Sequence, residues 1–189
     1  MRRSVTESIR TIAVLACVVG STPKATAEPA KDSLIIYGDG FAFSVREPAG
    51  WTGNSEKAAS IGANVTFSPA GKADDPSAPL VRVRISSKED ENTRADLDYD
   101  MEEYRKRFPK VQFGDIELTH PSYPVFSKLF FMPGEWYEYV AYLNPGVGVP
   151  KVFSVSMNLQ KRQATAAEVE AFRRVLGSLQ FLTKNVLKR

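Results

Sequence analysis

Cysteine and histidine are almost absent from this sequence, which contains one of each among its 189 residues. The cysteine, Cys17, lies near the N-terminus, so the rest of the chain has no disulfide, no thiol nucleophile and no cysteine-ligated metal site. Stability must therefore come from the hydrophobic core, and a single domain of about 150 residues buries enough surface to fold without cross-links. A long apolar run is missing as well, because Ile12–Val19 is too short to span a bilayer.

The N-terminus has the three parts of a secretory signal. Arginines precede the apolar run and an Ala-x-Ala cleavage sequence follows it: Arg2, Arg3, Arg10, Ile12–Val19 and Ala25–Ala27. We expect residues 1–27 to be a signal peptide that is removed after Ala27, which leaves 162 residues in the periplasm or outside the cell. The alternative is lipoprotein processing at Cys17, which would anchor the protein through an acylated cysteine. Only five apolar residues precede Cys17, so the simpler signal is favoured.

Net charge is also absent once the signal is set aside. The whole chain has 25 basic and 22 acidic side chains. Residues 1–27 contain four of the basic and one of the acidic side chains, so the mature chain has 21 of each. A neutral mature chain gives no electrostatic reason to expect a nucleic-acid partner.

The first half of the mature chain has the periodicity of strands. Leu34–Tyr37 and Phe41–Val45 are apolar runs joined by Gly-Asp-Gly, which predicts a hairpin. Ala63–Phe67 is a short strand candidate, and Pro69–Pro79 is a loop rich in Pro, Ala, Gly and Asp. Within Leu80–Ser86, the apolar residues Val81, Val83 and Ile85 alternate with Arg82 and Arg84, which is typical of a half-buried strand.

Two helices and four more strands complete the pattern. The first helix begins at Asn92 or Thr93 and ends at Phe108, and the second opens with Thr165 and Glu168 at capping-box spacing. Strands are expected at roughly 111–118, 125–132, 135–143 and 151–159, paired sequentially and antiparallel. The sequence therefore predicts an α+β fold, an antiparallel β-sheet of about six strands packed between helices. One domain spans residues 28–182, and the basic tail 183–189 is expected to fray.

The acidic run in the first helix does not predict a metal site. Asp96, Asp98 and Asp100 have the spacing that begins a calcium loop. The sixth position of that loop is Met101 rather than glycine, and the twelfth is Arg107 rather than glutamate. A solvated acidic helix face is the better interpretation.

His120 is the one candidate for acid–base chemistry, and Ser122 lies beside it. The neighbouring sequence supplies neither an oriented base nor an oxyanion hole, so a surface loop histidine is favoured over a hydrolase site. We expect no catalytic residue, no metal and no cofactor.

The aromatic segment 135–143 is the main candidate for a binding surface. On a strand, Trp136, Glu138 and Tyr142 share one face, which places a carboxylate among large apolar groups. That carboxylate needs a partner, and Arg82 or Arg84 can supply one. The five residues form the candidate binding set, although packing of the aromatic side chains under a helix explains them as well.

The two ends of the mature chain resemble the PsbP-like family. They read FAFSVREPAGW at residues 41–51 and EVEAFRRVLGSLQF at residues 168–181. The resemblance implies an antiparallel sheet between helices. It also implies that the Gly-Asp-Gly turn closes a hairpin of the core and that Trp51 is a packing residue. The family includes a photosystem II subunit, a Ran-binding import factor, secretion chaperones and DcrB-like envelope lipoproteins, which are mostly non-enzymatic and bind proteins. It supplies no catalytic residues that could be transferred to this sequence.

Three functional hypotheses follow, in order of preference. The first is an exported, non-enzymatic binding or accessory protein that contacts a protein partner in the cell envelope. The second is a carrier of a small apolar ligand or lipid, with the aromatic strands as one wall of a cavity. The third is a hydrolase at His120 and Ser122.

Overall fold

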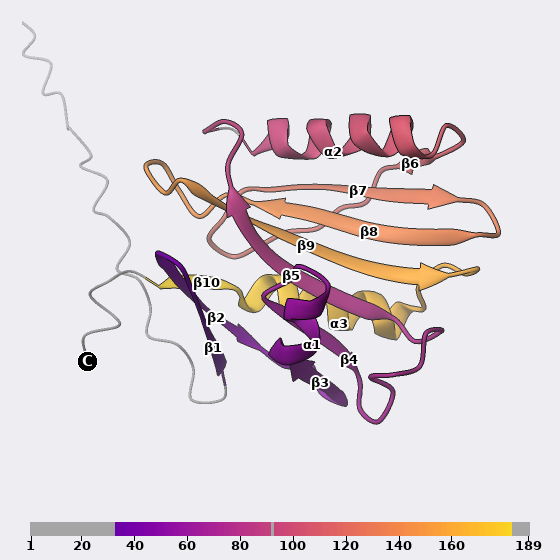
Figure 1. Ribbon diagram of the computed structural model, residues 1–189, viewed down its shortest axis with the longest axis horizontal. Coiled ribbons are helices and arrows are strands. Elements are labelled where there is room, and N and C mark those ends of the chain that lie inside the picture. The colour runs from indigo at the N-terminus through magenta and orange to yellow at the C-terminus, as the bar shows by residue number, and fades with distance from the viewer. Residues whose placement is uncertain (1–32, 92, 183–189) are drawn as a thin grey trace, which may run out of the picture.

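A computed structural model describes residues 33–91 and 93–182 of the chain (Figure 1). The expected signal peptide, the alternative anchor at Cys17, the expected tail 183–189 and the alternative helix cap at Asn92 lie outside the described residues. None of the helices in the described ranges combines the length and the hydropathy of a bilayer-spanning segment.

The centre of the fold is a seven-stranded sheet in which every pair of neighbouring strands is antiparallel. Its order is β3 (Trp51–Asn54), β4 (Val65–Pro69), β5 (Leu80–Ser87), β9 (Lys151–Gln160), β8 (Trp136–Leu143), β7 (Val125–Met132) and β6 (Gln112–Gly114). The last four follow the expected sequential pairing, and β5 then joins β9 across a long stretch of sequence. The α+β class and the antiparallel sheet predicted from the sequence are confirmed.

A second, three-stranded sheet has the order β1 (Ser33–Gly38), β2 (Phe41–Arg46) and β10 (Gln180–Leu182). The expected hairpin of β1 and β2 is present, and its turn contains Gly40 at a φ of +73°. Because β10 pairs with β2 on the side opposite β1, the first and last strands of the described chain flank the same strand (Figure 1). The Gly-Asp-Gly turn therefore belongs to the architecture, as the sequence indicated.

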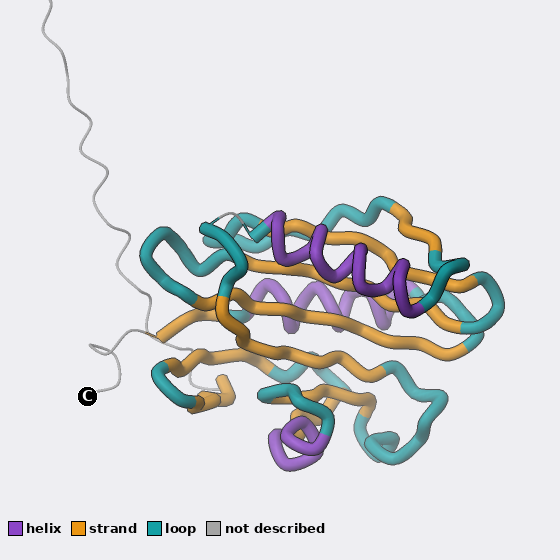
Figure 2. The backbone as a smooth tube through the Cα atoms, turned by 45° about the horizontal axis from the view of Figure 1, so that its top comes forward, coloured by secondary structure: helices purple, strands orange, loops and turns teal. Residues whose placement is uncertain are grey.

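Two long helices cover opposite faces of the large sheet. They are α2 (Arg94–Arg107) and α3 (Ala166–Ser178), and Figure 2 shows them on either side of the strands. The expected capping box opens α3, since Thr165 Oγ1 accepts from the Glu168 N–H at 3.3 Å and the Glu168 carboxylate accepts from the Thr165 N–H at 2.8 Å. Thr93 occupies the cap position of α2, where its side chain makes no capping bond.

Each helix closes its own hydrophobic core. The larger core lies between the large sheet, α3 and the small sheet, and includes Phe43, Phe67, Phe153, Met157, Phe172 and Leu176. The smaller core lies beneath α2 and consists of Leu97, Phe130, Val140, Tyr142 and Val152. Trp51 packs against the larger core, in agreement with its expected packing role.

Three elements of the structure have weak sequence signals. Helix α1 (Ser55–Ser60) buries only Ala58, so its sequence has no apolar stripe. Strand β3 contains Gly53 and two polar residues, and β10 has only three residues. The strand expected at 111–118 is shorter than predicted, because only Gln112–Gly114 pair with β7.

Candidate functional site

A polar groove crosses the large sheet between α1 and α2. Cavities of about 290, 250 and 210 Å³ lie along it, and Arg82 lines all three. Residues 57–63 and the loop at 72–79 line one side, and Asp100, Tyr104, Arg107 and Phe108 of the α2 region line the other. We call this surface the groove. Figures 1 and 2 show α1 and α2 on the same side of the sheet, flanking β5 and β9.

Strand alternation explains why the floor of the groove is polar. Arg82 and Arg84 of β5 pair in register with Ser156 and Ser154 of β9, and Asn158 continues the row. The intervening residues of both strands, such as Val83 and Val155, point into the larger core. An antiparallel sheet can leave one face in water, and this strip of the sheet is the part that α2 does not cover.

Glu138 lies at the centre of the groove and is only 4% exposed. One carboxylate oxygen accepts from the Arg82 guanidinium, and the other accepts from the Tyr104 hydroxyl at 2.7 Å. Arg82 also donates from Nε to Ser156 Oγ at 3.3 Å. Burial, together with the neighbouring Glu138 charge, raises the pKa of Tyr104, so its hydroxyl stays a donor. These contacts fix the arginine over the floor.

A second tyrosine–carboxylate contact joins the same helix and strand in the opposite sense. The Tyr142 hydroxyl of β8 donates to the Asp100 carboxylate of α2, whereas in the first contact a helix tyrosine donates to a strand carboxylate. Burial raises the pKa of Asp100, and the bond from Tyr142 opposes that rise. Together the two contacts hold α2 at a fixed position beside the groove.

The expectation of a fully solvated acidic face on α2 is therefore wrong for two residues. Asp100 is half-buried against Tyr142, and Asp96 is buried where it accepts from the Glu89 N–H at 3.1 Å. Both lie on the side of the helix that faces the sheet, whereas Asp98 remains exposed and pairs with Arg94 at 2.9 Å. The helical spacing of the aspartates contained this information, because positions 96 and 100 are one turn apart.

The five candidate binding residues share one face of the large sheet, but they lie in different surroundings. Arg82, Arg84 and Glu138 line the groove, and Arg82 is the partner that Glu138 required. Trp136 lies at the α2 end of the groove, where its ring centroid is 5.5 Å from that of Phe108. Tyr142 is 6% exposed and belongs to the smaller core.

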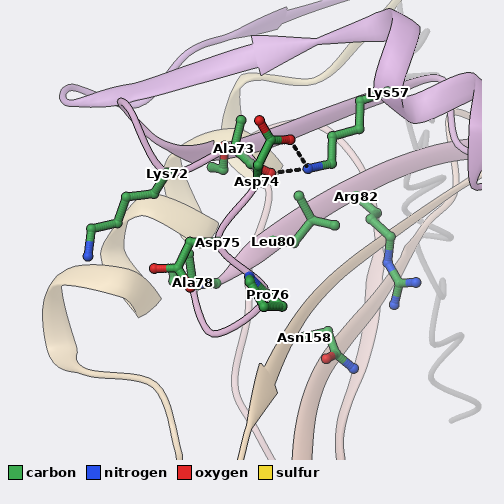
Figure 3. Close-up of a pocket in the computed structure, with 12 residues that line it drawn as sticks. Lys57, Lys72, Ala73, Asp74, Asp75, Pro76, Ala78, Leu80, Arg82 and Asn158 are labelled. Carbon is green, nitrogen blue, oxygen red and sulfur yellow. Dashed lines mark hydrogen bonds and ion pairs between the residues drawn. The ribbon is translucent and has the colours of Figure 1, made fainter.

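Sequence reasoning missed most of the remaining groove residues. Lys57 and Lys72 come from α1 and from the loop before β5, and Lys57 forms an ion pair with Asp74 at 3.3 Å (Figure 3). Ser154, Ser156 and Asn158 were detectable, because polar residues occupy every second position of KVFSVSMNLQ. The contribution of residues 57–79 depends on tertiary packing, for which the sequence offers no periodic signal.

His120 has a structural role in this arrangement. Its Nδ1 accepts from the backbone N–H groups of Ser122 and Tyr123, both at 3.0 Å, and its Nε2 lies 2.9 Å from the Leu179 carbonyl oxygen. The ring stacks on Tyr123 at 4.5 Å, and burial lowers its pKa. Both ring nitrogens are therefore engaged with the backbone, which leaves no base directed at the Ser122 hydroxyl.

No family model matches the sequence, and no curated protein matches it. Among solved structures, the chain is similar to cyanobacterial PsbP from Synechocystis sp. PCC 6803, with a TM-score of 0.47 and 17% sequence identity. The similarity covers 87% of this chain and 99% of that one.

Proposed function

We propose that this chain is an exported, non-catalytic binding domain that contacts a protein partner through the groove. The observation that carries the proposal is the strip of sheet between α1 and α2, where polar side chains line three adjoining cavities. Arg82, Glu138 and Tyr104 are held in place by one another, so the recognition surface is formed before a partner binds. Such preorganisation lowers the entropy cost of association.

The packing of the aromatic strands supports a protein partner over an apolar ligand. A carrier needs an apolar wall, but Tyr142 is buried beneath α2, and Tyr139 packs on the opposite face with its ring 6.4 Å from that of Phe172. Charged, hydroxyl and amide side chains line the groove together with apolar ones such as Pro76, Ile61 and Trp136. Polar groups of this kind match the hydrogen-bonding surface of a peptide chain better than they match a lipid.

Export and the site of action are part of the same proposal. We place the mature protein in the periplasm or outside the cell after cleavage near Ala27. Lipid attachment at Cys17 is the alternative, and it would change how the domain is held at the envelope without changing the groove.

Site-directed cross-linking tests the proposal. Ile61 lines the groove and is 45% exposed, and Ile35 is a matched control on β1 that is 40% exposed. Cells that produce Ile61→Cys or Ile35→Cys would be treated with a thiol-reactive photo-cross-linker, and their envelope adducts compared by mass spectrometry. We expect one reproducible protein adduct from Ile61→Cys alone. Equal adducts at both positions, or an apolar metabolite copurifying in place of a protein, would contradict the proposal.

A further inference from the structure

The anionic side chains of the groove all have hydrogen-bond partners within the protein, whereas some of its cationic side chains do not. Five cationic and four anionic side chains line its three cavities: Lys57, Lys72, Arg82, Arg84, Arg107, Asp74, Asp75, Asp100 and Glu138. Each carboxylate already accepts hydrogen bonds from the protein. Asp74 is bonded to Lys57, Asp75 to Ser77, Asp100 to Tyr142, and Glu138 to Arg82 and Tyr104.

Three of the five cations have no such partner. Lys72, Arg84 and Arg107 make no side-chain hydrogen bond or ion pair with any residue in the described part of the chain. Lys72 attracts Asp75, and Arg84 attracts Asp100, but only through space. All three side chains are exposed, and one lies in each cavity. Asp74 and Glu138 are ion-paired, whereas Asp75 and Asp100 accept only from neutral hydroxyl and amide groups and keep their charge. The groove therefore presents three cations without a direct carboxylate partner against two carboxylates without a direct cationic partner.

The spacing of the charges favours a flexible anionic chain over a compact anion. Lys72, Arg84 and Arg107 each line a different one of the three cavities, so a compact anion in a single cavity meets only one of them. Between them, Ser154, Ser156 and Asn158 offer neutral hydrogen-bonding groups. An extended peptide presents alternate side chains on one face at intervals of about 7 Å, so it can reach more than one cavity, and it has backbone amides that such groups can bind.

We infer that the groove recognises an extended acidic segment of a protein, with carboxylates placed against Arg84, Lys72 and Arg107. This inference rests on the proposed function and specifies the chemistry of the partner. A single-stranded nucleic acid is disfavoured, because its closely spaced phosphates would meet the carboxylates of Asp75 and Asp100 as well as the three cations. A peptide can instead place its carboxylates only where the cations lie.

Fluorescence anisotropy with designed peptides tests the inference. The probe is a short labelled peptide that alternates Glu and Ser, titrated with the purified full chain, and it is compared with peptides that alternate Gln and Ser or Lys and Ser. We expect binding of the Glu peptide only, weakened as salt is raised from 0.05 M towards about 0.5 M because exposed charges are screened. Equal binding of the Gln peptide, or tighter binding of single-stranded oligothymidylate, would overturn the inference.

Paired double variants locate the binding site. In Arg84→Gln/Arg107→Gln the Glu peptide should bind about fivefold to tenfold more weakly, because two partly exposed ion pairs are lost. The control Arg46→Gln/Arg173→Gln makes the same change in net charge at exposed arginines outside the groove and should bind like the unaltered chain. Equal effects in both variants would show attraction to net charge rather than to the groove, and would overturn the inference.

Protein binding at the groove and the acidic character of the partner can be refuted separately. If Ile61→Cys yields its protein adduct while the Glu peptide does not bind, the groove is a protein-binding site and the acidic class is wrong. If the adduct is missing as well, the proposed function fails with it. Thermal unfolding of every variant, which should match that of the unaltered chain because the altered side chains are exposed, shows that folding is retained.

Discussion

The ion pair of Arg82 with Glu138 should be strongly coupled, and its two single variants should differ. Arg82→Ala leaves a carboxylate that is 4% exposed with only the Tyr104 hydroxyl as a donor. Breaking a buried pair in this way costs 3–5 kcal/mol, and because the Arg82 side chain is 33% exposed we expect about 3 kcal/mol. Glu138→Ala leaves an arginine that can turn into the water of the groove, so its cost should be smaller, about 2 kcal/mol.

The double variant separates coupling from packing. Arg82→Ala/Glu138→Ala leaves no buried charge, so we expect it to cost about 3 kcal/mol, which gives a coupling energy of about 2 kcal/mol. Urea unfolding at pH 7, followed by tryptophan fluorescence and circular dichroism, measures all four free energies of unfolding. Additive single costs would refute this reasoning.

Four further predictions concern the scaffold. Thr165→Ala should cost about 1 kcal/mol through loss of the α3 cap, whereas Thr165→Ser should retain most of the stability in urea unfolding. Arg162 holds the pKa of Glu168 at about 2, below its ordinary 4.5, so this group contributes stability above pH 4.5 that is lost as the pH falls towards 2; acid unfolding of Glu168→Gln should be flatter in that window. Burial lowers the pKa of His120 below 6.5, so the folded protein should lose stability as the pH falls through and below that value, and His120→Gln, followed by urea unfolding, should remove this dependence. Phe172→Ala should cost about 3–5 kcal/mol by opening a cavity in the larger core, and a cost below about 1 kcal/mol would show that α3 does not pack as described.

Strong periodicity made the long elements of the fold predictable. Strand β7 has the expected bounds, and β8, β9 and α3 differ from expectation by a residue or two, because each has a clear apolar face or a capping signal. Short elements such as β3 and β10 exist because neighbouring strands complete their hydrogen bonding, so their formation depends on tertiary contacts. The division into two sheets follows from the same cause, since β10 is joined to β2 by contacts between the two ends of the described chain.

The candidate site was predictable where its residues alternate along a strand. A carboxylate among aromatic residues in β8 required a cation, and the alternation of β5 offered Arg82 on a polar face. The walls of the groove were not predictable, because Lys57, Lys72 and Arg107 lie on three elements that the fold brings together. Their sequence neighbourhoods are those of ordinary solvated residues.

The two hydrophobic cores differ in size and lie on opposite faces of one sheet. One core can therefore be disrupted by local unfolding while the other stays packed. Release of α2 would break the small core and the two tyrosine–carboxylate contacts while the core beneath α3 stayed closed. Such a sub-global opening requires less free energy than complete unfolding. Native-state hydrogen exchange should therefore show the amides of α2 exchanging at a lower free energy than those of α3. The same helix forms one wall of the groove, so the width of the groove is coupled to the less stable of the two helical layers.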